Sequence, residues 1–134
     1  MDTKELMIGD LVSIGTKSPE FYGIIESIDV LELYIKSLLT GDIERHFNSS
    51  LKPILITPEI LEKNGFKNVN TQRYDLEDPI VGYHINVNPK RKFIHINSCF
   101  MGNCNLYPTD INVHTFQHAL RLCGLGNLAD NFQV

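Results

Sequence analysis

Short runs of alternating apolar and polar residues make up the first part of the chain. Leu31, Leu33 and Ile35 fall on one side of such a run and Glu32 and Lys36 on the other, which is the period of a half-buried strand. We expect four strands here, at Leu11 to Ile14, Phe21 to Ile28, Val30 to Ser37 and Ile43 to Phe47. Several short strands close together predict a small barrel or a strongly bent sheet.

A short helix follows, with clear start and stop signals. Thr57 can cap its N-terminus, Pro58 suits the first helical position, and Glu59 is favourable at the positive end of the helix dipole. Gly65 can supply the left-handed residue that ends a helix, and Phe66 the apolar contact beyond it. The sequence therefore predicts a helix between Thr57 and Gly65.

The second part continues with a hairpin and a final helix. Ile80 to Val87 and Lys92 to Ser98 are typical of strands, joined by the turn Asn88-Pro89-Lys90-Arg91. Cys99 to Thr109 is expected to be irregular. From about Asn112 to Cys123 the apolar residues recur at helical spacing. The sequence therefore predicts a hairpin followed by a C-terminal helix.

The final helix has one apolar arc and one polar side. The arc contains Val113, Phe116, Ala119, Leu120 and Cys123. We expect this arc to pack on the hairpin face that carries Val81, Tyr83, Ile85 and Val87. On the other side of the helix, we expect His114, His118 and Arg121 to be solvated.

These elements place the chain in the α+β class, with a β-rich part, a linking helix, a β-hairpin and a C-terminal helix packed on the sheet. The length of 134 residues is that of one ordinary domain. We expect residues 1–134 to form a single compact domain, with the β-rich part over 1–52 and the helix, hairpin and C-terminal helix over 53–134.

Charge narrows the classes of function. Residues 1–52 carry the whole net charge of −4 and residues 53–134 are neutral, which argues against duplex nucleic acid and anionic membranes as partners. No run approaches the roughly 18 apolar residues of a membrane span, and the first residues lack the pattern of a secretory signal. Three cysteines suit a reducing compartment, so we expect a cytoplasmic protein.

Three segments resemble a family of small uncharacterised proteins of gut bacteria and their phages. These segments are ELMIGDLV (Glu5 to Val12), ITPEILEKNGF (Ile56 to Phe66) and VHTFQHALRLCG (Val113 to Gly124). The resemblance implies an origin in a phage, prophage or other mobile element, and a location in the cytoplasm of a bacterial host cell. It implies no known activity.

The start of the chain is also similar to SH3-like and KOW-type barrels. Gly9-Asp10-Leu11-Val12 is followed by Tyr22-Gly23-Ile24-Ile25 and then Ile28. In those barrels the Gly-Asp pair lies in the turn that starts a strand, and the second glycine opens the next strand. The resemblance implies an SH3-like barrel over the first part, and a module that binds RNA or protein.

Cysteines and histidines offer one candidate metal site. Cys99, Cys104, His114 and His118 have the spacing C-x4-C-x9-H-x3-H, which has the ligand order of a zinc finger but a shorter middle spacer. Thr115 follows the first histidine and cannot serve as the general base of a metalloprotease. A small zinc module is one alternative, and free thiols beside solvated histidines are the other; no other cofactor is indicated.

Two charged clusters complete the candidates. Arg73, Lys90, Arg91 and Lys92 could bind an anionic ligand such as a nucleotide, or could simply keep a hairpin tip solvated. Asp75, Glu77 and Asp78 could hold a divalent cation through carboxylate oxygens, but they lack the spacing of an EF-hand, and we expect a solvated acidic loop. No complete catalytic set, phosphate-binding loop or dinucleotide fingerprint is present.

Three hypotheses of function follow. The first is a non-enzymatic accessory protein of a phage or mobile element that binds a host or viral protein. The second is a protein that sequesters an anionic nucleotide signal of host defence, and the third is a zinc-binding module. The sequence indicates neither the partner nor the oligomeric state.

Overall fold

The chain forms two compact units, Met1–Ile54 and Leu55–Val134. The computed structural model describes residues 5–15, 21–29, 32–70 and 72–134. Each unit contains an antiparallel five-stranded sheet, and the second unit also contains the helices α1 to α3. The α+β class is therefore confirmed. The boundary between the units lies two residues beyond the predicted change at residue 52, and the single-domain arrangement stays a prediction.

Sheet 1, the sheet of the first unit, has the strand order β4-β3-β2-β1-β5. Its strands are β1 (Leu11–Ile14), β2 (Phe21–Ile28), β3 (Glu32–Ser37), β4 (Ile43–Phe47) and β5 (Leu51–Lys52), with a 3-10 turn at Asn48–Ser50 before β5. The predicted strands are confirmed, although Val30 and Leu31 lie outside the described residues. Leu33 and Ile35 face a core that also contains Val12 and Ile25, as their alternation predicts.

The described strands of this sheet do not close into a barrel. Its edges are β4 and the two-residue β5, which do not pair with each other, so the bent-sheet alternative holds over the barrel. Gly9 and Asp10 lie in a bonded turn before β1: the Gly9 amide donates to the Ile25 carbonyl at 2.8 Å, and Asp10 Oδ2 accepts from the Met7 amide at 2.8 Å. The second glycine of the barrel pattern, Gly23, lies within β2, which begins at Phe21. Gly23 is buried where a Cβ would clash with Ile35 and Ile14.

Sheet 2, the sheet of the second unit, has the order β10-β9-β8-β7-β6. Its strands are β6 (Lys67–Asn68), β7 (Tyr74–Asp78), β8 (Tyr83–Asn88), β9 (Phe93–Ser98) and β10 (Gly102–Leu106). The predicted hairpin is β8–β9, with the Asn88 side chain accepting from the Arg91 amide at 2.9 Å. Strand β8 starts later than predicted, because Val81 lies in the turn that Asp78 closes.

Helix α1 (Pro58–Lys63) begins and ends where the sequence predicts. The Thr57 hydroxyl oxygen accepts from the Ile60 amide at 3.3 Å, and Gly65 adopts a φ of 87°. The amide of Phe66 then bonds the Leu61 carbonyl at 3.0 Å, and both side chains are buried. The punctuation of this helix is therefore confirmed.

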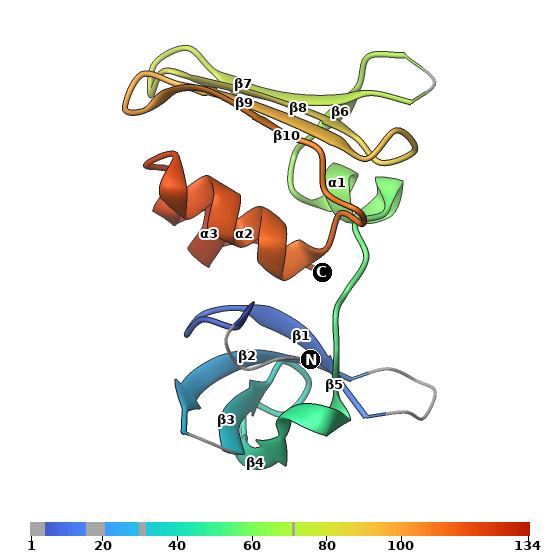
Figure 1. Cartoon of the computed structure of the whole chain (residues 1–134), viewed down its shortest axis with the longest axis vertical. Coiled ribbons are helices and arrows are strands. Elements are labelled where there is room, and N and C mark those ends of the chain that lie inside the picture. The colour runs from blue at the N-terminus through green and yellow to red at the C-terminus, as the bar shows by residue number, and fades with distance from the viewer. Residues whose placement is uncertain (1–4, 16–20, 30–31, 71) are drawn as a thin grey trace. The chain divides into compact units, whose positions relative to one another are not determined.

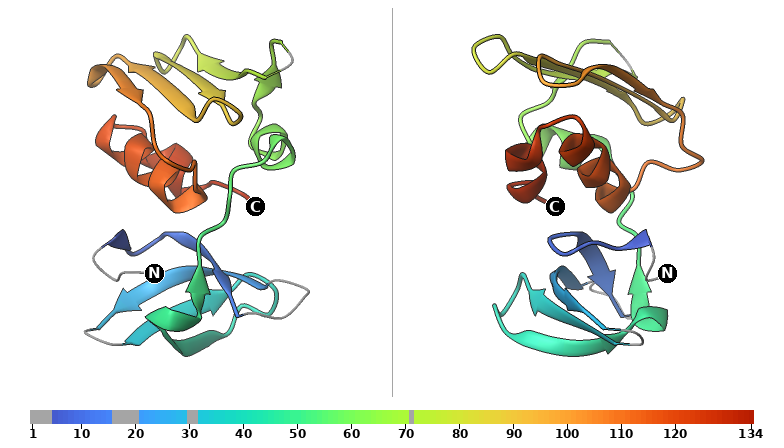
Figure 2. Two further views of the ribbon diagram at one scale, coloured as in Figure 1. Left: turned by 45° about the vertical axis from the view of Figure 1, so that its right-hand side comes forward. Right: turned by 60° about the vertical axis from the view of Figure 1, so that its left-hand side comes forward.

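Helices α2 (Val113–Leu122) and α3 (Gly126–Asp130) lie with α1 on one face of sheet 2 (Figures 1 and 2). The predicted apolar arc of α2 is buried, with Phe116 fully inaccessible beside Phe66 and Phe132. Of the predicted hairpin face, Ile85 and Val87 are buried, whereas Val81 is 47% exposed. The C-terminal helix therefore packs on the predicted face of the sheet, but Val81 is not part of that face because β8 begins after it, at Tyr83.

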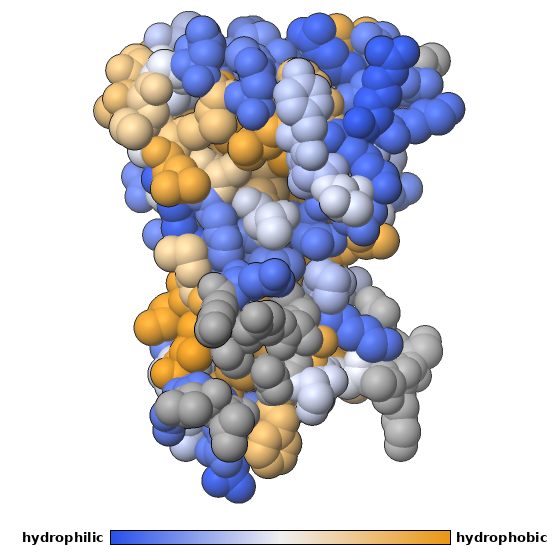
Figure 3. Space-filling model, viewed as in Figure 1, coloured by the Kyte–Doolittle hydropathy of each residue, from blue (hydrophilic) through white to orange (hydrophobic). Residues whose placement is uncertain are grey.

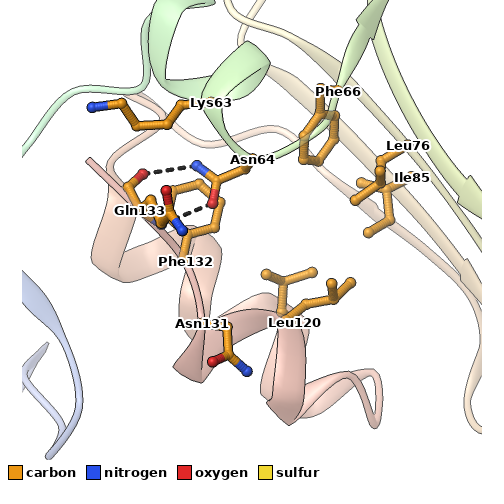
Figure 4. A pocket seen from close by; sticks show the side chains of 10 residues that line it. Lys63, Asn64, Phe66, Leu76, Ile85, Leu120, Asn131, Phe132 and Gln133 are labelled. Carbon is orange, nitrogen blue, oxygen red and sulfur yellow. Dashed lines mark hydrogen bonds between the residues drawn. The ribbon is translucent and has the colours of Figure 1, made fainter.

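The last residues are held against α1 beside a small apolar cavity of about 200 Å³ (Figure 4). The side-chain amide of Asn64 donates to the Gln133 carbonyl at 2.7 Å, and its oxygen accepts from the Gln133 amide at 2.8 Å. Phe66, Leu120 and Phe132 line the cavity. This two-point clamp fixes the segment after α3 to the start of the unit. Within the described residues, no helix has the length and apolar character needed to cross a membrane.

Candidate functional site

An apolar groove of about 440 Å³ lies between sheet 2 and α2 in the second unit (Figure 3). Its walls are formed by Ile94, Cys104, Leu106, Tyr107, Pro108, Thr115, His118, Ala119 and Leu122. Four of these residues have polar side-chain atoms, and they are Cys104, Tyr107, Thr115 and His118. An apolar groove with a few polar groups is the usual form of a binding site.

Two periodicities create the groove walls. On β10, alternate residues point to opposite faces, so Cys104 and Leu106 face α2 while Asn103 and Asn105 face away. On α2, the four lining residues follow the helical spacing i, i+3, i+4 and i+7, and these are Thr115, His118, Ala119 and Leu122. The groove is therefore a regular product of a strand beside a helix.

Strand β10 forms both a wall of the groove and the edge of sheet 2. Among the described strands it pairs only with β9, so its other side presents backbone amides and carbonyls without a strand partner. Its sequence is Gly-Asn-Cys-Asn-Leu, with neither charge nor proline. The usual devices that prevent a new strand from adding to an edge are absent from β10 itself.

The thiols of Cys104 and Cys123 are neighbours, and Cys104 lines the groove. Burial raises the pKa of the Cys123 thiol, and the Cys104 thiol beside it raises that pKa further. Cys123 is therefore held as a neutral thiol and is a poor nucleophile. It is buried at the end of α2, as the sequence predicts, and its carbonyl accepts from Ser98 Oγ at 2.9 Å.

The four predicted metal ligands do not form one cluster. Cys104 and His118 both line the groove. Cys99 is exposed in the β9–β10 turn and donates to the Val81 carbonyl at 3.3 Å. His114 is close to His118, with ring centroids 5.9 Å apart. Across the residues that the structure describes, no group of three or more His, Cys, Asp or Glu side chains could hold a metal ion.

The predicted solvation of the polar side of α2 was wrong. His114 is only 2% exposed and His118 is half-buried. Gln117 is also buried, and its side-chain amide donates to the Ala129 carbonyl of α3 at 3.0 Å. Helix α2 is thus buried on more than one side, because α3 covers the side that carries Gln117. The pattern of the sequence did not predict α3.

Two of the four residues in the predicted basic cluster form ion pairs with carboxylates. Arg73 forms a two-point ion pair with Asp75, at 2.8 and 2.9 Å, and Lys92 lies 3.1 Å from Asp110. Lys90 and Arg91 are exposed at the hairpin tip. The four side chains therefore do not converge on one anion site in this structure.

The predicted acidic loop is instead strand β7, so this expectation was wrong. Asp75 also accepts from His84 Nε2 at 3.3 Å, and the Arg73 guanidinium beside it lowers the pKa of the Asp75 carboxyl. Asp78 Oδ1 accepts the amides of Ile80 and Val81 and closes the next turn. Asp75 and Asp78 thus have local structural roles, which charge alone could not reveal, whereas Glu77 is exposed.

Strand β10 was missed because its sequence does not resemble a strand. Glycine and asparagine are depleted in strands, and they occupy three of its five positions. One usable signal was the alternation of Asn103, Cys104, Asn105 and Leu106, which is the period of a half-buried strand.

Searches of protein-family models, curated proteins and solved structures found no match to this chain. The resemblance to proteins of gut bacteria and their phages therefore stays a prediction.

Proposed function

We propose that this chain is a protein-binding module that captures an extended segment of its partner along β10. The observation that carries the proposal is an uncharged, unprotected sheet edge beside an apolar groove. An extended peptide that adds to such an edge gains main-chain hydrogen bonds for affinity, and its alternate side chains enter neighbouring pockets for specificity.

The groove favours a partner segment with an apolar side chain. Ile94, Leu106 and Ala119 form apolar walls of the groove. Burial of an apolar side chain of the partner there would contribute about 25 cal/mol for each Å² removed from water. The Thr115 hydroxyl at one wall donates to the Asn112 carbonyl at 3.0 Å and keeps its oxygen as an acceptor, so an adjoining N–H or O–H of the partner would also be accommodated.

This proposal gives a physical form to the first hypothesis from the sequence, an accessory protein that acts by binding a host or viral protein. A phage or mobile-element origin is part of the same proposal and has only the sequence resemblance in its support. The alternatives gain less support, because Arg73 and Lys92 already pair with carboxylates and, among the described residues, no three His, Cys, Asp or Glu side chains could hold a metal ion.

The test is selection from a displayed library of random seven-residue peptides, with a matched pair of variants. Leu122 is 75% exposed at the groove, and Leu39, in the first unit, is 72% exposed. Leu122→Lys places a charge at the groove mouth and should weaken capture of the selected peptides by about tenfold or more. Leu39→Lys should leave capture unchanged.

A second measurement locates the bound peptide. On binding, amide hydrogen exchange should slow across Gly102–Leu106 and stay unchanged across Ile43–Phe47, the corresponding edge of sheet 1. The proposal fails if no peptide is selected, if Leu39→Lys weakens capture as much as Leu122→Lys, or if the protection appears only outside β10.

A further inference from the structure

The outward face of sheet 2 carries a regular array of polar and aromatic side chains. Ile85, Val87, Ile94 and Ile96 point to the core and are buried, so their neighbours along each strand face outward. Three adjacent rows cross β8 and β9 and continue onto β10 or the residue after it, and they are Asn88, Phe93 and Tyr107; Asn86, His95 and Asn105; and His84, Asn97 and Asn103. Tyr107, which follows β10, also lines the groove beside α2. We call these nine residues the amide array.

The composition of the amide array is unusual for strands. Five of its nine residues are asparagines, two are histidines and two are aromatic, although asparagine is depleted in strands. None is Lys, Arg, Asp or Glu, and all nine are exposed or half-buried. The helices of the second unit all lie on the opposite face of the sheet (Figures 1 and 2). The array is therefore an uncharged surface rich in hydrogen-bonding groups.

One end of the array forms an aromatic platform. The ring centroid of Phe93 lies 5.1 Å from that of Tyr107, and 6.4 Å from that of His95, with which it is stacked at an interplanar angle of 11°. Apolar ring faces beside amide groups match a ligand that has both C–H faces and hydroxyl groups. A sugar ring has these two surfaces.

The middle of the array is held in place by a network of polar side chains. Arg73 donates to the Asp75 carboxylate, which also accepts from His84. When the Asn86 side chain is turned so that its amide nitrogen faces Asp75, that nitrogen lies 2.7 Å from Asp75 Oδ1 and donates to it. On the next strands, His95 Nδ1 bonds the Asn105 side-chain oxygen. Such fixed side chains lose little freedom when a ligand binds.

Charge decides between the ligands that could use such a face. A nucleic acid strand would need cations along its phosphates, but the nine residues of the array include none, and Asp75 and Glu77 border it on β7. The exposed cations Lys90 and Arg91 lie only at one end, in the β8–β9 turn. A neutral ligand meets no unfavourable charge there. We therefore propose that the amide array binds a neutral hexose oligosaccharide, with sugar rings on Phe93 and Tyr107 and hydroxyl groups bonded to Asn97, Asn103 and Asn105.

The test uses cellohexaose, laminarihexaose, maltohexaose and mannohexaose as probes, with a uridine hexanucleotide as the competing class. Asn97 and Asn103 are exposed, so the double variant Asn97→Ala/Asn103→Ala should remain folded by circular dichroism. We expect calorimetry to detect binding of at least one hexaose. The double variant should weaken that binding about tenfold or more, because two hydrogen-bonding side chains are removed.

Asn68→Ala/Asn127→Ala is the matched control, since both residues are exposed asparagines outside the array. This control and Leu122→Lys, on the opposite side of the sheet, should bind the sugar as the parent does. The proposal is overturned if all four hexaoses fail to bind, if the array and control variants lose equal affinity, or if only the hexanucleotide binds. These outcomes are separate from those of the peptide selection.

Discussion

Sheet 1 ends at β4, which carries Glu44, Arg45 and His46 along its edge, whereas sheet 2 ends at β10, which carries no charge. Arg45 lies 3.7 Å from Glu32 of the neighbouring strand, so the charges of β4 belong to an ordinary solvated surface. Charged residues at an edge discourage a further strand from adding. The difference suggests that β10 is an edge kept available for pairing, while β4 is protected.

The two outward faces differ in the same way. In sheet 1, Tyr34 and Lys36 alternate with the buried Leu33 and Ile35, which is the usual pattern of a strand with one face in water. In sheet 2, the corresponding positions hold amides and imidazoles in place of most charges. The two sheets share an antiparallel architecture, so the contrast lies in side-chain chemistry, which is where function resides.

The largest effect on stability is expected from the core of the second unit. Phe116 is fully buried and meets the rings of Phe66 and Phe132. Phe116→Ala should lower the free energy of unfolding by about 3–5 kcal/mol, because it leaves a cavity among aromatic side chains. Urea unfolding followed by circular dichroism measures this loss. A loss under about 1 kcal/mol would show that the packing of α2 on sheet 2 is wrong.

A smaller effect is expected from overpacking in sheet 1. Gly23 of β2 is buried against Ile35 and Ile14, and a Cβ at this position would overlap both. Gly23→Ala should therefore cost about 1–3 kcal/mol of unfolding free energy. Gly41, which has no atom within 4 Å of a built Cβ but a φ of 77°, provides a comparison in which backbone strain acts without crowding. A Gly23→Ala protein as stable as the parent would contradict the close approach of β2 and β3.

A third change removes one cap from the second unit. Thr57→Ala deletes the side-chain oxygen that accepts the Ile60 amide, and the expected cost is about 0.5–2 kcal/mol. Thr57→Ser keeps the hydroxyl and should retain most of the stability. Thermal unfolding of the two variants side by side measures the cap, and equal midpoints for Thr57→Ala and the parent would show that the cap contributes nothing.

Local signals in the sequence were enough where each element carries its own boundaries. Thr57, Pro58 and Gly65 specify α1 through capping and backbone geometry, which depend on few neighbours. The alternation of Leu33 and Ile35 specifies β3 in the same way. The arc of α2 was found because Phe116 and Leu120 recur at helical spacing.

The rest depended on tertiary contacts. Strands β6, β7 and β10 exist because neighbouring strands supply their hydrogen bonds, against the low strand propensity of Asn and Asp. The burial of His114 could not be read from its polarity, since it depends on what surrounds α2. The groove joins β10 to α2 across intervening sequence, so Cys104 and His118 were the two of its lining residues proposed as candidate site residues.

The smallest effect concerns the ion pair that borders the amide array. Hydrogen bonds from Arg73 lower the pKa of the Asp75 carboxyl in the folded protein. Ionised Asp75 therefore stabilises the fold above its ordinary pKa of about 3.9, and this contribution is lost as the pH falls through the lowered pKa. Asp75→Asn should reduce stability at about pH 7, with a difference from the parent that shrinks in acid.

Urea midpoints measured across this pH range test the expectation. Asp42→Asn, at an exposed position in the first unit, is the control, because Asp42 forms no ion pair among the described residues. The contrast between the two sheets predicts a pH-dependent difference for Asp75→Asn alone. A difference that stays constant from neutral to acid pH would show that Asp75 acts through packing. The ion pair between Arg73 and Asp75 would then not stabilise the network of side chains beside the amide array.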